Sequence, residues 1–316
     1  MRNVDPLISL PNVKPHVNDL LFKNVSNPTA DLIVKYNRIL ELAHENEARV
    51  AYIFDDMKRN NIVIMLYIKS RRRNKKFLNA IKSLHPTILY KRRSNEPPPL
   101  KLTKRDPVAT ITSITLLGER ITSQDDYKFA IGFFAKDKTN PNLIYMVTAG
   151  HCASLNETIF YYGRVIGEVT SCKLAPFEYS LIKITDDNFK SSAIIKNTNS
   201  SLYNQLFVND VTTPSSIGVH SCKSGPYSDV TCGNVISLNV LYKDLGEIQR
   251  TFITNMISLE GDSGSPTFSY SSDLRKVSLT GIVDGGYYGT TTVTSIKEIL
   301  EHANLEPITH DFSLIN

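Results

Sequence analysis

The sequence predicts an all-β protein of two consecutive β-barrels with a C-terminal helix, preceded by a small α+β unit. Three observations lead to this prediction. The chain has 316 residues, more than one ordinary domain holds. Apolar residues at helical spacing alternate with β-rich runs in the first third of the chain. After Asp106, short β-rich runs separated by turn residues follow one another to a final helical segment.

Changes in composition set the expected boundaries. Residues 1–28 hold four prolines and little periodicity, and Pro97–Pro99 is flanked by basic residues, as is typical of an exposed linker. Lys104 and Arg105 also form a dibasic pair, a candidate processing site. We therefore expect a lead-in at 1–28, the α+β unit at 29–93, a linker at 94–107, the first barrel at 108–205, and the second barrel with the C-terminal helix at 206–316.

The α+β unit combines both kinds of hydrophobic pattern. From Thr29, the predicted N-cap, apolar residues recur at helical spacing as far as about Glu47. Two β-rich runs, at 50–54 and 62–68, flank a polar turn and predict a hairpin. The unit is completed by a short helix at 77–84 and a strand at 87–90.

Charge is divided unequally along the chain. Residues 1–105 carry 21 Lys and Arg against 9 Asp and Glu, a net charge of +12, whereas residues 106–316 carry 15 against 22, a net charge of −7. Such a division predicts that the two parts attract each other. Nucleic acid is the alternative partner for the basic part. Because no aromatic residues interleave the basic run at 69–76, we expect no nucleic-acid binding.

Beyond the linker, the pattern is of short strands with turns between them. A polar stretch around 190–201 divides the strands into two sets. A closing helix is predicted at 295–303, with Ser295 and Glu298 spaced as a capping box. The predicted strands are 110–117, 129–134, 144–147, 158–162, 165–169 and 180–184 in the first set, and 217–221, 230–241, 251–255, 265–268, 279–283 and 290–293 in the second.

Two short stretches carry the chemistry, Val147–Cys152 and Gly261–Pro266. A serine hydroxyl is a weak nucleophile at neutral pH, so acyl transfer needs a base for its proton and donors for the oxyanion. His151 is the candidate base and Ser263 the candidate nucleophile. The backbone N–H groups of Gly261 and Ser263 are the candidate oxyanion hole, in a loop whose glycines permit a tight turn.

Histidine and serine stretches in this order resemble those of the chymotrypsin-like serine proteases. The segments Val219–Gly225 and Cys232–Val235 are similar to the streptogrisin and alpha-lytic protease branch, and the likeness covers about residues 106–303. It implies a serine endopeptidase that acts on peptide or protein substrates through an acyl-enzyme. It also implies that the α+β unit is a pro-segment, docked in cis in a zymogen form.

The resemblance also assigns supporting residues. The mature start Ile-Val-Gly-Gly of trypsin-like enzymes is absent, and in the bacterial branch an internal cation pairs with the aspartate beside the nucleophile. This implies an activation ion pair between Lys223 and Asp262. The triad acid maps to Glu178, where the family normally has aspartate. Glutamate can still accept the histidine N–H bond.

Asp284 is a second departure from the family pattern. It precedes Gly285 and Gly286, where the family commonly has a serine that touches the triad acid. We expect Asp284 to lie close to Glu178, and either to share a proton with it or to replace it as the partner of His151; Glu178 is the preferred acid. Because of this pair, a catalytically impaired, protease-fold binding module is the alternative function. The intact Gly261–Pro266 stretch favours an active enzyme.

The predicted substrate cleft lies around Gly285, Gly286, Ile257 and Tyr287. Glycines leave the backbone free to pair with an extended peptide. No aspartate occupies the place that would select Lys or Arg, so we expect an apolar P1 side chain. No metal-ligand spacing or phosphate-binding glycine loop is present, and we expect no metal and no cofactor.

The four cysteines all lie in the second part of the chain and bear on its location. An even number is compatible with two disulfides and secretion, although four cysteines permit three pairings. The resemblance implies a Cys222–Cys232 bridge and leaves Cys152 and Cys172 as the second candidate pair. No signal peptide is evident, and no apolar run approaches the length of a membrane span. We expect a secreted monomer.

Overall fold

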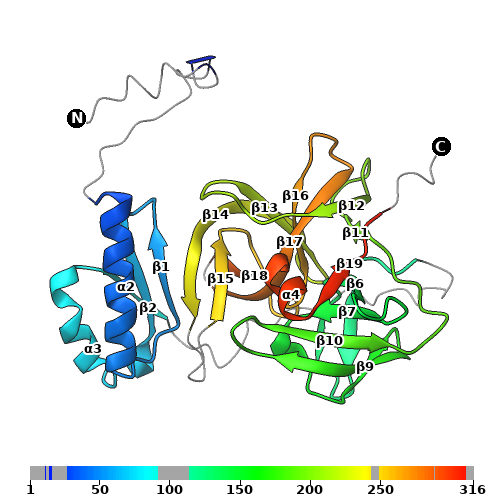
Figure 1. Cartoon of the computed structure of the whole chain (residues 1–316), viewed down its shortest axis with the longest axis horizontal. Helices are drawn as coiled ribbons and strands as arrows, with labels where there is room; N and C mark the ends of the chain where they lie inside the picture. Colours follow the sequence, from blue (N-terminus) through cyan, green and yellow to red (C-terminus); the bar gives the residue numbers. More distant parts are fainter. Residues whose placement is uncertain are drawn as a thin grey trace.

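The computed structural model describes residues 27–91, 114–242, 249–287 and 289–310, together with Pro11, Lys14 and Pro15. The α+β unit lies at one side of a larger body of two barrels (Figure 1). The predictions for the lead-in, for the Pro97–Pro99 linker and for the Lys104–Arg105 processing site fall almost entirely outside the described residues.

The α+β unit buries the apolar face of one helix against a three-stranded sheet. Leu32 and Ile39 of the helix pack with Ile53, Ile64 and Phe77 in one core. The crossover between the two parallel strands contains the second helix. The elements are α2 (Thr29–Glu45), β1 (Tyr52–Asp56), β2 (Asn61–Tyr67), η2 (Ile68–Ser70), α3 (Lys75–Ala80), η3 (Lys82–Leu84) and β3 (Thr87–Lys91).

The start of α2 differs from the prediction. Pro28, not Thr29, is the N-cap, and no side chain caps the helix. The carbonyl of Pro28 accepts the first helical hydrogen bond, from the N–H of Leu32 at 3.0 Å. Thr29 is therefore already inside the helix.

The first barrel is an eight-stranded sheet in the order β19-β6-β7-β10-β9-β8-β4-β5. Strand β19 at one edge of this sheet comes from the C-terminal end of the chain and pairs with β6. The strands are β4 (Arg120–Ser123), β5 (Lys128–Ala130), β6 (Phe133–Asp137), β7 (Ile144–Thr148), β8 (Thr158–Tyr161), β9 (Arg164–Lys173), β10 (Tyr179–Ile184) and β19 (Leu305–Pro307).

The second barrel belongs to an eleven-stranded sheet that also includes the α+β unit. Its strands are β11 (Ile194–Lys196), β12 (Gln205–Val211), β13 (His220–Gly225), β14 (Asp229–Tyr242), β15 (Gln249–Thr254), β16 (Pro266–Tyr270), β17 (Lys276–Tyr287) and β18 (Thr290–Ser295). Helix α4 (Ile296–His302) follows β18. One apolar core, which includes Phe134 and Phe268, extends through both barrels.

The α+β unit joins the second barrel by strand pairing. Strand β1 is antiparallel to β14, with Phe54 opposite Val240. A separate apolar cluster covers the join and includes Phe54, Val63, Val240 and Ile253. The Ser237 hydroxyl donates a hydrogen bond to Asp55 across it. Backbone hydrogen bonds and apolar contacts therefore hold the α+β unit to the second barrel.

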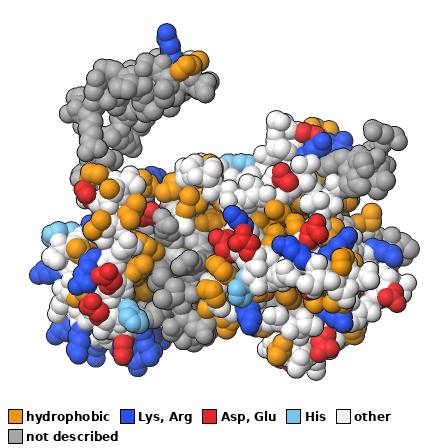
Figure 2. All heavy atoms as spheres, viewed as in Figure 1, with side chains coloured by type: hydrophobic (Ala, Val, Ile, Leu, Met, Phe, Trp, Pro, Cys, Tyr) orange, Lys and Arg blue, Asp and Glu red, His pale blue; other side chains and the backbone are white. Residues whose placement is uncertain are grey.

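The basic run of the α+β unit lies away from this join. Arg71–Arg73, Lys75 and Lys76 are exposed at and just before α3, which lies at the outer end of the unit (Figure 1). Figure 2 shows Lys and Arg side chains gathered over that end. The division of charge along the sequence predicted that the two parts attract each other, but this basic run points away from the barrels.

Several predicted elements are wrong or were not predicted. Within the described residues of the predicted strand 110–117, only an isolated bridge forms, between Leu117 and Ile195. Strands β4, β11, β12 and β19 had no predicted counterpart. The capping box at α4 is also wrong: Ser295 is the N-cap and ends β18, but its hydroxyl caps nothing, and neither it nor Glu298 Oε2 has a partner in the described part of the chain. Among the described residues, no helix is long and apolar enough to cross a membrane.

Candidate active site

His151 and Ser263 are 112 residues apart in the sequence and meet between the two barrels. His151 lies in the short helix η4 (Gly150–Cys152), directly after β7. Ser263 lies in the loop before β16, and its Oγ is 2.8 Å from His151 Nε2. Both barrels hold this loop: the N–H of Ala130 donates to the Ser263 carbonyl at 2.9 Å, and the N–H of Gly264 donates to the Val283 carbonyl at 2.8 Å.

Glu178 holds the other side of the histidine. It immediately precedes β10 and is only 4% exposed. Its Oε1 contacts His151 Nδ1 and also accepts the backbone N–H of His151 at 3.0 Å. One carboxylate oxygen thus fixes both the ring and its backbone. A proton on Nδ1, donated to Glu178, leaves Nε2 free to accept the proton of Ser263.

The environment of His151 favours the charged imidazole. Burial by itself would lower the pKa of His151, but the side chains of Cys152 and Glu178 outweigh it through hydrogen bonding and charge. The pKa of His151 is therefore raised well above its usual value of 6.5. Once a base has accepted the proton of a nucleophile, a raised pKa of the base means that it holds this proton more tightly.

Gly261 and Ser263 present backbone N–H groups beside the nucleophile. Gly261 has φ +87°, and a Cβ at this position would lie 2.3 Å from the ring of Tyr227, so only glycine fits the turn. Neither N–H group donates to another residue in the described part of the chain. Two unpaired N–H groups beside a serine hydroxyl are what an oxyanion hole requires.

Comparison with known proteins shows where this fold also occurs. No protein-family model matches the chain, and no curated protein matches its sequence. Solved structures do match: Thermobifida fusca protease A superimposes with a TM-score of 0.53 at 20% identity, over 63% of this chain and 100% of that one. The chain has the chymotrypsin-like fold.

Two further structures agree with this result. The chymotrypsin of Cellulomonas bogoriensis matches with a TM-score of 0.52 at 20% identity, covering 63% of this chain and 100% of that one. Nocardiopsis protease matches with a TM-score of 0.53 at 21% identity, covering 62% and 100%. The predicted chymotrypsin-like double barrel is therefore confirmed.

A buried ion pair lies beside the candidate nucleophile, Ser263. Lys223 Nζ is 3.2 Å from Asp262 Oδ2, and both side chains are completely buried. Asp262 Oδ1 also accepts the backbone N–H groups of Tyr227 and Ser228, at 3.0 and 3.3 Å. Burial lowers the pKa of Lys223, and the charge of Asp262 partly opposes this. Because Asp262 precedes Ser263, these bonds fix the turn that carries the candidate nucleophile.

Asp284 lies in β17 and has other partners than the histidine. Its Oδ2 accepts hydrogen bonds from the hydroxyls of Thr251 at 3.0 Å and Thr294 at 2.8 Å. Burial, and then the charge of Glu178, raise the pKa of Asp284 to about 7. The structure therefore places Glu178, and not Asp284, against His151.

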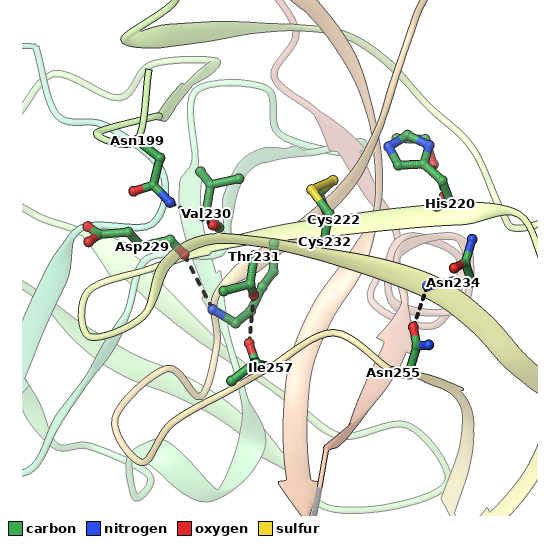
Figure 3. The surroundings of a disulfide bond; sticks show 12 residues. Asn199, His220, Cys222, Asp229, Val230, Thr231, Cys232, Asn234, Asn255 and Ile257 are labelled. Carbon is green, nitrogen blue, oxygen red and sulfur yellow. Dashed lines mark hydrogen bonds between the residues drawn. A yellow bond between two sulfur atoms is a disulfide. The ribbon is translucent and has the colours of Figure 1, made fainter. Parts of the chain in front are cut away.

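The expected cleft residues lie on β17 and on the segment before the nucleophile. Gly285 and Gly286 pair with β18 along one edge of the strand, and they have no strand partner on the other edge among the described residues. Ile257 is 59% exposed, and its carbonyl accepts the Thr231 hydroxyl at 2.6 Å (Figure 3). Tyr287 ends β17, but its side chain is outside the described part of the structure.

The cysteines agree with the sequence predictions only in part. A disulfide joins Cys222 of β13 to Cys232 of β14, which are directly opposite in register (Figure 3). Cys152 and Cys172, both described, are free thiols, so the second candidate pair is not formed. Cys172 instead donates to the Gly150 carbonyl at 3.0 Å. No group of three metal-ligating side chains occurs among the described residues.

Some residues of the site were not found from the sequence. Ser228 donates its hydroxyl to Asp262 at 2.5 Å and accepts from Lys223, so it links the two charges. Thr251 and Thr294 hold Asp284. Thr292 and Thr294 alternate along β18, and this spacing of two places them on one face of the strand. The alternation of threonines was the signal in the sequence for these residues. It does not show which strand lies opposite their face of β18.

Proposed function

We propose that the chain is a serine endopeptidase that hydrolyses peptide bonds through an acyl-enzyme. The observation that carries this proposal is the 2.8 Å contact between Ser263 Oγ and His151 Nε2, with Nδ1 of the same ring held by Glu178. Nucleophile, base and orienting acid in line are the requirement for serine-based acyl transfer.

The mechanism follows from these contacts. Ser263 Oγ attacks the peptide carbonyl carbon while its proton passes to His151 Nε2. The N–H groups of Gly261 and Ser263 stabilise the oxyanion of the tetrahedral intermediate. His151 then gives the proton to the leaving amine, and the C–N bond breaks. Water, deprotonated by His151, attacks the carbonyl carbon of the acyl-enzyme. The ester C–O bond then breaks, and His151 returns the proton to Ser263 Oγ as the acid product leaves. Glu178 remains ionised and stabilises the imidazolium.

The substrate of this reaction is proposed to be an extended peptide with an apolar P1 side chain. At Gly285 and Gly286, one edge of β17 pairs with no strand of the described residues and can accept such a peptide as an added strand. The exposed, apolar side chain of Ile257 supports the P1 preference. A peptide library in which cleavage after Lys or Arg predominated would contradict it.

The α+β unit is proposed to be a pro-segment that acts as a folding template and inhibitor of a zymogen. Its β1 adds a strand to β14, and the apolar cluster at the join supports stable docking. Residues 106–316 should fold poorly alone and recover when residues 1–105 are added as a separate chain. Efficient folding without the first part would remove the template role. The Cys222–Cys232 disulfide supports a secreted protein.

The function is tested by labelling Ser263 with a fluorophosphonate probe. An active enzyme forms a covalent adduct at Ser263, and the Ser263→Ala variant does not. A catalytically impaired binding module would fail to label although it folds. Labelling at Ser263 and its absence in the variant would together support the protease.

The pH dependence of the reaction gives a second prediction. Because only neutral imidazole accepts the Ser263 proton, kcat/KM should rise with pH and reach half its maximum above pH 6.5. The contribution of His151 to stability has the opposite direction: it is complete below pH 6.5 and is lost as pH rises through the raised pKa. Rate profiles and denaturation midpoints measured from pH 5 to 9 check both statements.

The variant Glu178→Gln is the control for this explanation. Removing the charge beside Nδ1 should lower the pKa of His151 and move the midpoint of the rate profile toward 6.5. The rate at high pH should also fall, by about 10⁴-fold if the acid orients the ring as in other serine triads. An unchanged midpoint would show that Glu178 does not set the pKa of His151.

A further inference from the structure

Helix α4 links the second barrel to the segment that carries the candidate acid. It follows β18 of the second barrel, and its buried apolar residues belong to the core that both barrels share. Its last residue is His302. Ser263 precedes β16 of the second barrel, whereas Glu178 precedes β10 of the first. A contact at the end of α4 can therefore set the place of the acid relative to the nucleophile.

His302 contacts both neighbours of Glu178. The Tyr179 hydroxyl and His302 Nδ1 are hydrogen-bonded at 2.7 Å, and Tyr179 is only 2% exposed. The rings of Phe177 and Tyr179 both meet the imidazole edge to face. The centroids are 5.8 Å apart in each pair, at interplanar angles of 73° and 77°. This is a favourable geometry for aromatic pairs. One side chain thus holds the residues on both sides of the candidate acid.

Glu178 itself faces the histidine of the triad. Successive side chains of an extended backbone point to opposite faces, so Phe177 and Tyr179 share one face and Glu178 has the other. Its Oε1 is held by His151, and a Cβ added to Gly150 would lie 3.0 Å from its Cγ. The regular pairing of β10 begins only at Tyr179. The backbone of Glu178 therefore lies just beyond the paired strand, and its neighbours help to fix its place.

We propose that His302 is a positioning residue for the reaction. Through Phe177 and Tyr179 it holds the backbone of Glu178, so that the carboxylate stays against His151. Glutamate has one more rotatable bond than the aspartate of the chymotrypsin-like proteases, so fixing its carboxylate costs more side-chain entropy. A backbone held on both sides reduces the number of places that this carboxylate can reach. The inference rests on the proposed protease function.

The variant His302→Leu tests the proposal, because it removes the hydrogen bond and the ring contacts at an exposed position. We expect kcat at the high-pH plateau to fall by about 10- to 100-fold, the larger value being the cost of a misplacement of about 1 Å. KM should change little, since only the acid moves. An unchanged kcat, or a loss confined to KM, would overturn the proposal.

Three further variants separate the contact with Tyr179 from the stability of α4. Asparagine has a polar amide close to the place of Nδ1, so His302→Asn should recover most of the kcat lost in His302→Leu. Tyr179→Phe removes the same hydrogen bond, keeps both rings, and should also lower kcat. The matched control is Glu301→Gln, which changes an exposed residue of the same turn, 3.9 Å from Lys297, and should leave kcat unchanged. A kcat in His302→Asn as low as in His302→Leu, or an equal loss in Glu301→Gln, would contradict the proposal.

The path of the effect is tested in the Glu178→Gln background. If His302 acts through the carboxylate of Glu178, little remains for it to position once that charge is gone. There, His302→Leu should lower kcat by less than about 2-fold, a coupling that a double-mutant cycle measures. Equal factors in the two backgrounds would show that His302 does not act through Glu178.

A readout without turnover separates this inference from the protease function. In the full chain with Ser263→Ala, the Nδ1 proton of His151 should give a low-field ¹H NMR resonance, because its acceptor is a carboxylate. Its loss in His151→Gln assigns it. His302→Leu should move or broaden this resonance, and His302→Asn should not.

The two proposals can therefore fail separately. If the resonance responds to His302→Leu but Ser263 of the wild type does not label, the protease proposal fails and the positioning of Glu178 stands. If Ser263 labels but His302→Leu changes neither the resonance nor kcat, the role of His302 is refuted and the protease stands.

Discussion

Replacing Ser263 with alanine is expected to lower kcat for peptide hydrolysis by about 10⁶-fold, the size of loss seen when a serine protease loses its nucleophile. In the proposed mechanism, Ser263 Oγ forms the acyl-enzyme, and its 2.8 Å contact with His151 Nε2 is the route for its proton. The N–H groups of Gly261 and Ser263, which donate to no other described residue, remain in the variant, so a small residual rate is expected. Initial rates on a peptide with an apolar P1 residue measure the change.

Ser265→Ala is the matched control for that loss. Ser265 lies two residues away and is completely buried, but its hydroxyl has no partner in the described part of the structure. Removing an unpaired buried hydroxyl is nearly neutral or stabilising. The control should therefore keep its activity and its stability. If Ser263→Ala lost less than about 100-fold, oxyanion stabilisation alone would account for the rate, and Ser263 would not be the nucleophile.

Replacing Lys223 with methionine is expected to lower the free energy of unfolding by about 3–5 kcal/mol, since it leaves Asp262 buried without its cation. The two side chains are completely buried and 3.2 Å apart. Methionine fills a similar volume, so loss of packing contributes little. Activity should fall as well, because Asp262 holds the turn that precedes Ser263. Denaturant unfolding of the two proteins gives the difference directly.

Two further variants show whether charge is the cause. Adding Asp262→Asn to Lys223→Met removes the unpaired charge and should recover part of the stability, a coupling that a double-mutant cycle measures. Lys297→Met removes an exposed cation 3.9 Å from Glu301 and should cost only about 0.3–0.5 kcal/mol. Equal losses at Lys223 and Lys297 would show that the buried pair has no special role.

Much of the fold could be predicted because the information is local. Helix α2 and strands β1, β2 and β3 follow patterns contained within a few residues, and their predicted limits are close to those observed. Three of the strands that were missed, β4, β11 and β19, are three or four residues long. Such strands form because a distant partner supplies their hydrogen bonds, as β6 does for β19. No local pattern contains that partner.

The candidate site divides in the same way. The two stretches around His151 and Ser263 were evident because backbone geometry near a nucleophile demands particular neighbours, such as the glycine at 261 with its positive φ. The resemblance favoured Glu178 over Asp284, but residue types alone could not settle which of the two carboxylates lies against His151. It was decided by direction: Glu178 faces the imidazole, and Asp284 turns at a bulge toward Thr251.

The sequence by itself predicted most of the helices and strands, and it showed which serine and histidine are the candidates for chemistry, because period, turn residues and loop motifs are written in consecutive residues. Its resemblance to the chymotrypsin-like serine proteases implied the double barrel. Only the tertiary structure decided which groups meet. It set Glu178 against His151, left Cys152 and Cys172 unpaired, and joined β1 to β14. Contacts between residues far apart in the chain depend on how the strands close into barrels, and side-chain direction is fixed only there.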